Sequence, residues 1–232
     1  MAKKFLTLSF DDGSIYDRRL VALFNQYGLK CTFNLNVGLF GESCLLEGET
    51  YAIRHTRVNL TEVRRLYEGH EIAGHGMKHP DLTRCSRREI IHQVEDERRA
   101  LSTLAGYKVR GFAYPGGSLY GRKTVEILKR DTGIEYARNM DASMCFVLPD
   151  NWYEWRPTIF HGSPLLMETA RRFLETKSEE DMLLYVWGNA YELEAWQSWD
   201  VLEEFCKMVS GREDVIYATN IEVKDMICGG VQ

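Results

Sequence analysis

Two neighbouring carboxylates and two histidines carry the clearest chemistry in this sequence. Asp11 and Asp12 precede Gly13 at the end of an apolar run, and His75 and His79 lie four positions apart. Imidazoles at this spacing can face one divalent metal ion together, with one carboxylate and water completing its coordination. Each motif also has an ordinary interpretation, because Asp-Asp-Gly is common in turns and His-x-x-x-His arises by chance. Together they favour a catalytic metal site.

Predicted strands lead into these residues. Residues 5–10 alternate apolar side chains with Thr7 and Ser9, which is typical of a mostly buried strand. Because adjacent carboxylates repel each other inside a strand, we expect the Asp pair at its end, with Gly13 turning the chain. Three further predicted strands also end in polar or turn residues, and they span residues 70–74, 109–114 and 182–187.

Helical patterns alternate with strands along the chain. The helices are expected at residues 17–27, 59–69 or 61–69, 86–105, 122–131, 164–174, 199–209 and 221–227, and the remaining strands at residues 31–37, 136–138 and 215–219. Ser86 and Glu89 form a capping box at the start of the longest helix. Residues 38–58 show no period and are expected to be irregular. Without a linker, the chain predicts one domain over residues 1–232, an α/β fold with parallel strands in an open sheet or compact barrel.

The composition is that of an ordinary globular protein, with 44% hydrophobic and 27% charged residues among 232. A net charge of −5 gives no electrostatic basis for nucleic acid or an anionic membrane as a partner. No segment has the pattern of a signal peptide or a transmembrane helix, so we expect a cytoplasmic protein. Six widely spaced cysteines without a Cys-x-x-Cys pair predict scattered reduced thiols. The oligomeric state stays open.

Three motifs resemble the first three motifs of the polysaccharide deacetylase family, in the same order. They are Ser9-Phe10-Asp11-Asp12-Gly13, His75-Gly76-Met77-Lys78-His79 and Phe112-Ala113-Tyr114-Pro115-Gly116-Gly117. The resemblance, which covers nearly the whole chain, implies a distorted (β/α)7 barrel and a hydrolase that removes N- or O-linked acetyl groups from a sugar or polysaccharide. It also implies Asp11 as the general base and Asp12, His75 and His79 as ligands of one divalent ion. We expect zinc, with cobalt, nickel or manganese as alternatives, and an acetylated sugar or glycan as the substrate.

These implied roles agree with the chemistry of the residues. A bound divalent ion lowers the pKa of its water from about 15.7 toward about 7 and polarises the acetyl carbonyl. Asp11 can take the proton from the attacking water, and a backbone N–H near Gly116 can face the oxyanion. Contacts to the substrate are expected from Tyr114, Pro115, Gly116, Trp155, Trp187, Asn189 and Glu192. For any single aromatic residue in this set, packing in the core or rim is an equally good interpretation.

The sequence departs from the family pattern at two positions. The family's third motif usually has an arginine that orients the catalytic aspartate, but Ala113 stands there, and Arg110 is the nearest candidate. The fifth motif usually supplies a histidine that protonates the leaving group, and Asn189 stands in its place. Because an amide cannot deliver a proton at neutral pH, we consider His161 first and Glu192 second as replacements. The remaining histidines are interpreted as structural or surface residues, and they are His55, His70 and His92.

Two other functions remain compatible with these residues. A protein on this fold could bind carbohydrate or regulate another protein, without catalysis, if Asn189 has removed the general acid. The same superfamily also contains hydrolases of non-sugar C–N bonds, and a cytoplasmic location favours small substrates over a cell-wall polymer. Turnover of acetylated oligosaccharides by the Asn189→His variant would separate an impaired enzyme from a binding protein.

Overall fold

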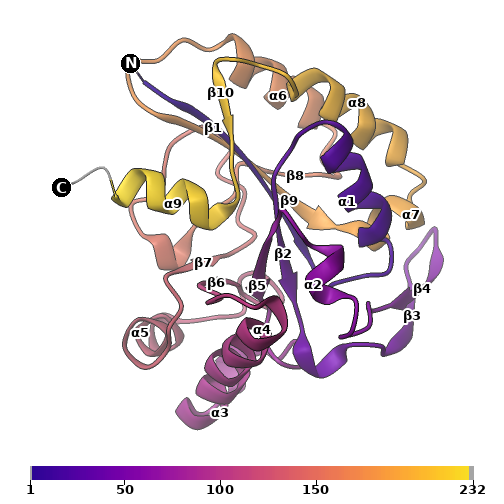
Figure 1. The fold of residues 1–232 in the computed structure, drawn as a ribbon, viewed down its shortest axis with the longest axis vertical. Coiled ribbons are helices and arrows are strands. Elements are labelled where there is room, and N and C mark those ends of the chain that lie inside the picture. Colours follow the sequence, from indigo (N-terminus) through magenta and orange to yellow (C-terminus); the bar gives the residue numbers. More distant parts are fainter. Residues whose placement is uncertain (1, 230–232) are drawn as a thin grey trace.

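A curled sheet of parallel strands organises the chain, and the computed structural model describes residues 2–229 (Figure 1). In spatial order, the strands are β7 (Tyr136–Arg138), β6 (Gly111–Ala113), β5 (Glu71–Gly74), β2 (Cys31–Leu35), β1 (Lys4–Asp11), β9 (Met182–Asn189) and β8 (Ile159–Phe160). Each neighbouring pair along this path is parallel. A bridge between Arg138 and Trp155 links the β7 edge to the segment that leads into β8. The predicted α/β fold of distorted-barrel type is confirmed.

The central strand β1 carries the first part of the site. Its neighbour β9 pairs with it along its whole length, from Lys4 opposite Met182 to Asp11 opposite Asn189. The other edge of β1 is shared, because β10 (Val215–Tyr217) pairs with its first residues and β2 with its last ones. All residues of β1 after Lys4 are buried. This burial is expected for a parallel sheet that is covered on both faces.

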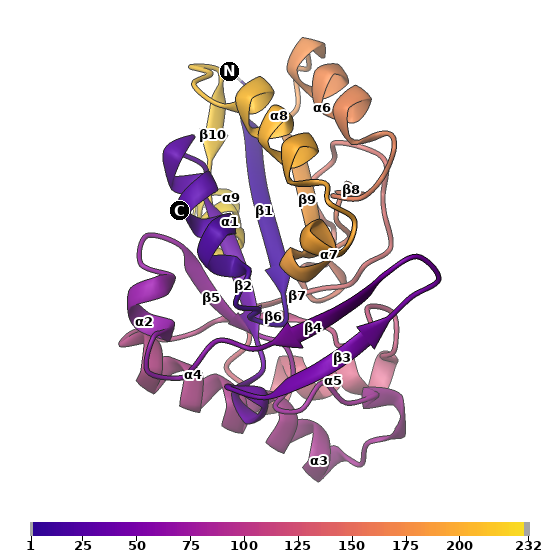
Figure 2. The same cartoon turned by 90° about the vertical axis from the view of Figure 1, so that its right-hand side faces the viewer.

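Helices cover the outside of the sheet (Figures 1 and 2). They are α1 (Asp17–Gln26), α2 (Val63–Leu66), α3 (Arg87–Ile91), α4 (Glu97–Ala105), α5 (Arg122–Asp131), α6 (Leu166–Glu175), α7 (Ala190–Ala195), α8 (Trp199–Val209) and α9 (Asn220–Cys228). Phe24 of α1, Phe173 of α6 and Phe205 of α8 are fully buried in one core cluster with Leu6 and Leu8 of β1. Within residues 2–229, none of the helices is long and apolar enough to cross a membrane.

The segment predicted to be irregular, residues 38–58, contains a β-hairpin instead. Its strands β3 (Ser43–Glu47) and β4 (Ala52–Thr56) pair antiparallel and form a sheet of their own. β3 is almost entirely exposed, so its sequence lacks the alternation that a half-buried strand would show. Figure 2 shows the hairpin crossing the C-terminal end of β1, and a bridge between Ser14 and Arg57 attaches it there.

Candidate active site

The Asp-Asp-Gly motif forms the turn that ends β1, as predicted. Asp11 is the last residue of the strand, and Asp12 and Gly13 adopt left-handed backbone conformations with φ of 75° and 62°. The Asp12 N–H donates to the carbonyl oxygen of Asn34 at 2.9 Å, which ties the turn to the end of β2. A left-handed conformation is uncommon for any residue other than glycine, and it occurs often at functional sites. The turn directs the two carboxylates toward different partners.

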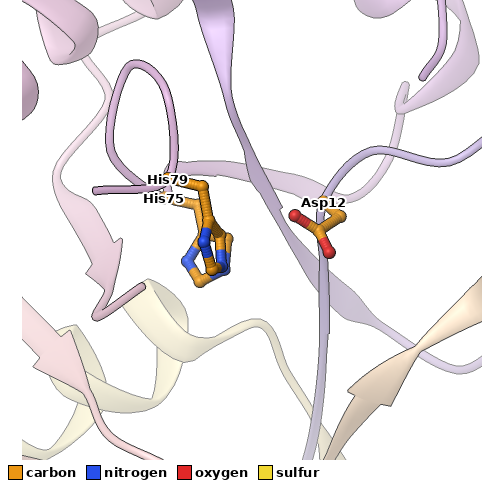
Figure 3. A group of neighbouring side chains, drawn as sticks. All are labelled: Asp12, His75 and His79. Atoms are coloured by element: carbon orange, nitrogen blue, oxygen red, sulfur yellow. The ribbon is translucent and has the colours of Figure 1, made fainter. Parts of the chain in front are cut away.

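Asp12, His75 and His79 come together as a candidate metal site (Figure 3). One potential ligand atom from each residue lies within 4.8 Å of the others. His75 Nδ1 lies 2.9 Å from the carbonyl oxygen of Ala113, so the ring donates from Nδ1 and keeps a lone pair on Nε2. Metal-binding histidines are commonly oriented by such a hydrogen bond. The donor set of two imidazoles and one carboxylate therefore fits a divalent ion.

The charges of the site also suit metal binding. Burial by itself would raise the pKa of Asp12, but His75, His79 and the Arg57 guanidinium outweigh that effect and hold it below its usual value. Burial and the neighbouring His75 lower the pKa of His79, which favours the neutral imidazole. Metal ions bind ionised carboxylates and neutral imidazoles. These two ligands therefore need no change of protonation at neutral pH.

The loop that carries the two histidines is held by buried polar groups. The Asn36 side-chain amide donates to the carbonyl oxygens of His75 and Gly76 at 2.8 and 2.7 Å. The buried carboxyl group of Glu97, on α4, accepts the Gly76 N–H at 2.7 Å. Any Cβ at Gly74 would lie 2.8 Å from this carboxyl group, so glycine is required there for the close approach. The backbone before and at His75 is thus fixed on several sides.

A π-helical stretch also contacts the loop that carries the two histidines. The predicted continuous helix of residues 86–105 contains a π-helical stretch, His92–Asp96, between α3 and α4. The carbonyl oxygen of Gln93 in this stretch accepts the Met77 N–H at 3.0 Å. Single π-turns are frequent at functional sites. His79 then follows with a left-handed φ of 52°, which turns its ring toward His75.

Arg138 holds Asp11 in place, and the sequence prediction missed it. Its Nη2 lies 2.6 Å from Oδ1 and 2.5 Å from Oδ2 of Asp11, and Asn34 Nδ2 donates to Oδ1 at 2.8 Å. The Arg138 side chain is 1% exposed, and its guanidinium lies over the Trp187 ring at 4.9 Å. The sequence did contain a feature that could have identified Arg138. This residue ends the predicted strand 136–138, and the ends of parallel strands meet at the site.

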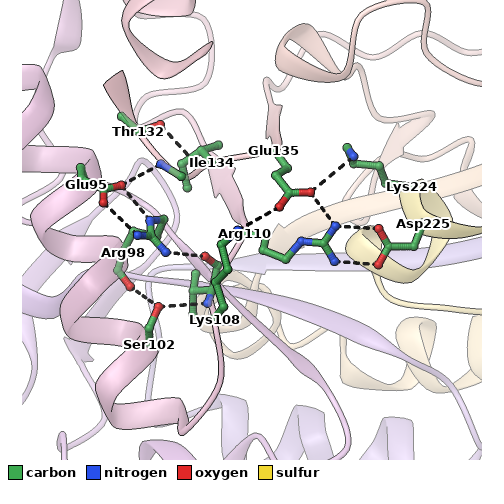
Figure 4. Close-up of polar contacts among 12 residues, drawn as sticks. Glu95, Arg98, Ser102, Lys108, Arg110, Thr132, Ile134, Glu135, Lys224 and Asp225 are labelled. Carbon is green, nitrogen blue, oxygen red and sulfur yellow. Dashed lines mark hydrogen bonds and ion pairs between the residues drawn. The ribbon is translucent and has the colours of Figure 1, made fainter. Parts of the chain in front are cut away.

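Arg110 does not contact Asp11, so the structure corrects that prediction. Figure 4 shows its guanidinium between two carboxylates, with Nη2 bonded to Glu135 and both terminal nitrogens to Asp225 at 2.7 Å. Arg110 precedes the first residue of β6 and therefore lies at the N-terminal end of the sheet. The reactive groups gather at the opposite end. Arg110 is therefore close to the Tyr-Pro-Gly-Gly motif in sequence but far from the reactive groups in space.

A cavity of about 560 Å³ joins most of the predicted site residues. Its size is in the usual range for small-molecule sites, which is about 300–1,000 Å³. The predicted residues that line it are Asp11, Asp12, His75, His79, Tyr114, Gly116, Trp187, Asn189 and Glu192. Residues that were not predicted also line it, and they are Cys44, Leu46, His55, Arg57, Gly117, Arg138, Met140, Phe160 and Tyr191.

Two predicted substrate contacts pack elsewhere. Trp155 is 1% exposed and belongs to a core cluster, where its ring packs against Tyr136 and Tyr185. Pro115 does not line the cavity but lies beneath the histidine loop, where a Cβ at Gly76 would meet it at 2.9 Å. Both side chains therefore contribute to the packing around the site and do not line the cavity. The sequence could not separate these roles, because both residues adjoin predicted strand ends.

The turn after β6 leaves one backbone donor free. The N–H groups of Tyr114, Gly117 and Ser118 donate to carbonyl oxygens at 2.9, 3.0 and 2.8 Å. Within residues 2–229, the Gly116 N–H makes no hydrogen bond, and Gly116 has a left-handed φ of 60° and lines the cavity. Such a donor is a candidate for contact with an oxyanion.

Asn189 and Glu192 line the cavity at and just after the end of β9, and both belong to a polar cluster with His161. Glu192 Oε2 lies 3.1 Å from His161 Nε2 and accepts from Asn189 Nδ2 at 3.3 Å. The His161 side chain is 1% exposed and does not line the cavity, whereas Glu192 does. Of the two candidate proton donors, only Glu192 is therefore in a position to touch a ligand.

The hairpin adds two polar residues that the sequence did not assign to the site. His55 was interpreted as structural, yet it lines the cavity, and its ring packs against that of Tyr191 with centroids 4.4 Å apart. Burial and the nearby Arg57 lower the pKa of His55 to about 4, so it is neutral at pH 7. Arg57 Nη2 lies 3.2 Å from Asp12 Oδ1. In contrast, His92 is exposed and bonded to Asp96, and His70 Nδ1 accepts the Cys31 N–H.

Sequence comparison identifies related proteins. Residues 1–137 match a family model described as polysaccharide deacetylase. A chitooligosaccharide deacetylase from Sinorhizobium fredii is 47% identical over 38 residues, which are 16% of this chain and 18% of that protein. The match thus spans less than a fifth of the length of this curated relative.

Solved structures with this fold extend the similarity to nearly the whole chain. The Xyl-CE4 domain of a multidomain xylanase from the hindgut metagenome of Trinervitermes trinervoides superposes with a TM-score of 0.61 at 17% identity, covering 99% of this chain and 93% of that one. A family 4 acetyl xylan esterase from Clostridium thermocellum, in complex with a cobalt ion, gives 0.62 at 16% identity, covering 97% and 92%. At these identities the similarity establishes the fold.

Proposed function

Because the chain belongs to the polysaccharide deacetylase family, we propose that it is a metal-dependent hydrolase that removes N- or O-linked acetyl groups from a sugar or polysaccharide. The observation that carries this proposal is the group of Asp12, His75 and His79 beside Asp11 in one cavity. Zinc is the proposed ion, and cobalt, nickel or manganese would suit the same ligands. The cobalt-bound acetyl xylan esterase and the chitooligosaccharide deacetylase support the acetylated-glycan substrate.

Asp11 is the proposed general base. A divalent ion held by Asp12, His75 and His79 would lower the pKa of a coordinated water toward about 7 and polarise the acetyl carbonyl. Asp11 Oδ2 lies 3.9 Å from His75 Nε2, so its carboxylate is next to the metal ligands without being one of them. Arg138 and Asn34 hold the carboxylate at the cavity, where it can take a proton from the attacking water.

The Gly116 N–H is the proposed contact for the oxyanion. Negative charge develops on the acetyl oxygen as water attacks, and a donor that is already in position stabilises that charge without reorganisation. Trp187 is partly exposed, lines the cavity and can supply flat apolar surface for a sugar ring. Tyr114 also lines the cavity but is only 1% exposed. The Tyr114 ring is itself fixed, because it stacks on Tyr120 and its hydroxyl donates to the Tyr153 carbonyl oxygen.

Glu192 is the proposed proton donor to the leaving group, with His161 positioning it. Asn189 cannot donate a proton at neutral pH, so the family's usual group is missing here. Glu192 faces the cavity and shares a short contact with the buried His161 ring. A proton shared by this pair can pass from Glu192 to the departing amine or alcohol, and His161 keeps the carboxyl group oriented.

A carbohydrate-binding protein without turnover is the second candidate function. The observation that favours it is Asn189, which donates to Glu192 and occupies the place of the family's acid. A binding protein would retain the metal ligands and the aromatic surface but would release no acetate. Wild type and the Asn189→His variant would then both bind acetylated oligosaccharides and both fail to hydrolyse them.

The main test measures metal content and acetate release together. The purified protein should hold about one divalent ion per chain and release acetate from acetylated chitooligosaccharides or acetylated xylan. His75→Ala should lose the ion and the activity, because it removes one ligand of three. His92→Ala is the matched control, since His92 is exposed and paired with Asp96 away from the cavity. Unchanged metal content in His75→Ala would refute the site.

A further inference from the structure

The β3–β4 hairpin presents a cationic and a neutral polar side chain to the cavity. Side chains alternate along β4, so Ala52 and Arg54 are exposed while Ile53 and His55 are buried. Arg57 continues this alternation just after the strand, and both His55 and Arg57 line the cavity. The hairpin is thus one wall of the site, and its inward face carries hydrogen-bond donors.

Arg57 has donor groups that the protein does not use. Its Nη2 contacts Asp12 at 3.2 Å and its Nη1 lies 3.8 Å from the Cys44 thiol. Within residues 2–229, the buried Nε has no hydrogen-bond partner, and neither has Nε2 of His55. The Arg57 side chain is 12% exposed, so water reaches little of it. Buried donors without partners are costly, and a planar guanidinium prefers an anionic acceptor.

The balance of charge in the cavity points to an anion as well. The charged residues that line it are the carboxylates Asp11, Asp12 and Glu192 and the guanidiniums Arg57 and Arg138. With neutral histidines, this set has one negative charge in excess, and a divalent ion would convert it to one positive charge in excess. The terminal nitrogens of Arg138 are taken by Asp11 and by the Asn139 carbonyl oxygen, although its buried Nε, like that of Arg57, has no partner within residues 2–229. The terminal nitrogens of Arg57 make one contact with a carboxylate oxygen, at 3.2 Å, and one with the Cys44 thiol, at 3.8 Å, so Arg57 is the cation that can donate to a further anion.

We propose that Arg57, with His55 beside it, binds an anionic group of the substrate, so that the preferred substrate is an acetylated sugar bearing a carboxylate. The inference rests on the proposed function, because it places the acetyl group at the metal ligands. A carboxylate fits better than a phosphate, since one guanidinium and one neutral imidazole match a single negative charge and guanidinium binds carboxylates through paired hydrogen bonds.

A simpler role for Arg57 would be to orient Asp12 alone. Ligating carboxylates are commonly hydrogen-bonded by such partners, and loss of the partner weakens metal binding. The two roles differ in what they predict for the substrate. An orienting role affects neutral and anionic sugars equally, whereas anion binding affects only the anionic one.

The test compares three matched ligands on the metal-loaded protein. They are an N-acetylglucosamine oligomer, the same oligomer with a lactyl ether carboxylate on alternate sugars, and the carboxamide of that second ligand. Affinities are measured by calorimetry in the Asp11→Asn background, so that no ligand is consumed, and kcat/KM is measured with Asp11 present. Metal content is determined for each variant. Arg54→Gln is the control, because it removes the same charge from the outward face of β4.

The carboxylate ligand should bind about 10- to 100-fold more tightly than its carboxamide, as expected for hydrogen bonds to a charged group. Arg57→Gln should abolish this preference, Arg54→Gln should keep it, and Arg57→Lys should keep part of it because the charge remains. Equal affinity for carboxylate and carboxamide would overturn the inference. So would an Arg57→Gln variant that loses metal and weakens all three ligands equally. If wild type hydrolyses none of them, the proposed function fails, while the calorimetric preference still decides this inference.

Discussion

The two sides of the cavity are built differently. On the side formed by β1, β5 and β7, the catalytic candidates are fixed by buried partners, since Arg138 and Asn34 hold Asp11 and the Ala113 carbonyl orients His75. On the side formed by the end of β9 and the hairpin, Arg57 has a single 3.2 Å contact with a carboxylate oxygen, and Nε2 of His55 has no partner within residues 2–229. Some buried atoms lack partners on the first side as well, such as Nε of Arg138, but both carboxylate oxygens of Asp11 are held there.

We interpret this difference as a division between residues that carry out the reaction and residues that select the substrate. A group that is held by several short hydrogen bonds, as the Asp11 carboxylate is, cannot adapt to a ligand, but it can hold a reacting atom in place. A buried group without a partner gains from a ligand that supplies one, and it therefore discriminates between ligands. We infer that the β1 side performs the water attack and that the hairpin side chooses the substrate. Four variants test this division.

The largest effect is expected on the β1 side, at Asp11. Asp11→Asn keeps the size of the side chain but removes the proposed base, so kcat should fall by about 10²–10⁴, the usual contribution of a general base. Metal content should stay near that of wild type, because Asn retains an oxygen and the three ligands are unchanged. Acetate release and metal analysis on one preparation give both values. A variant that retains full activity would remove Asp11 from the mechanism.

Arg138→Met should cause the largest loss of stability. It leaves the buried carboxylate of Asp11 without its main partner, which typically costs about 3–5 kcal/mol in the free energy of unfolding. Arg110→Met is the matched control, since its ion pairs with Glu135 and Asp225 are partly exposed and should cost only about 0–1 kcal/mol. Urea denaturation of both variants measures the difference. Equal losses would mean that burial does not distinguish the two clusters.

On the opposite side, Glu192→Gln should lower kcat by about 10², near the lower end of the range for a general acid. The amide keeps the size of the side chain but cannot deliver a proton to the leaving group. Adding Asn189→His to this variant should restore part of the rate, because an imidazole then stands next to the same position. A kcat that is unchanged in Glu192→Gln would assign the proton to another group.

The smallest effect is expected from acid on the hairpin side. The pKa of His55 is about 4 in the folded protein against 6.5 ordinarily. Between these values the unfolded chain binds a proton that the folded chain does not, so the free energy of unfolding falls as pH is lowered. This linkage amounts to about 2 kcal/mol between pH 7 and pH 5.

Urea denaturation of wild type and His55→Asn at both pH values measures this effect, because the other titrating groups cancel in the difference. The stability of wild type relative to His55→Asn should decrease by that amount at the lower pH. His92→Asn, at an exposed histidine, should show no such change. A difference that does not depend on pH would show that His55 titrates normally in the folded protein.

The sequence predicted the parts of the molecule that follow local rules. The alternation in residues 5–10 predicted β1, and the capping box at Ser86 and Glu89 is present as expected. Strand-end logic brought Asp11, Asp12 and His75 together correctly, because the C-terminal ends of parallel strands meet. The same rule, applied to the predicted strand 136–138, would have found Arg138.

Other features depend on contacts that no local pattern encodes. The hairpin shows no hydrophobic period because β3 has no core to face, so its contribution of His55 and Arg57 was invisible in the sequence. Trp155 adjoins a strand end as Trp187 does, but only three-dimensional packing shows that the first lies in the core and the second in the cavity. The π-helical stretch likewise has no local signal in the sequence, and its Gln93 carbonyl oxygen bonds the Met77 N–H of a distant loop.

The pairing of β1 has a consequence for how the protein folds. Lys4 at the start of β1 pairs with Met182 of β9 and with Val215 of β10. During synthesis, all the proposed metal ligands therefore leave the ribosome well before the strands that bury one whole edge of β1. Contacts between such distant segments form slowly, and the chain exposes an unpaired strand edge until they do. We expect the metal-binding geometry to appear late, and a fragment that ends near residue 137 to contain its ligands without assembling them.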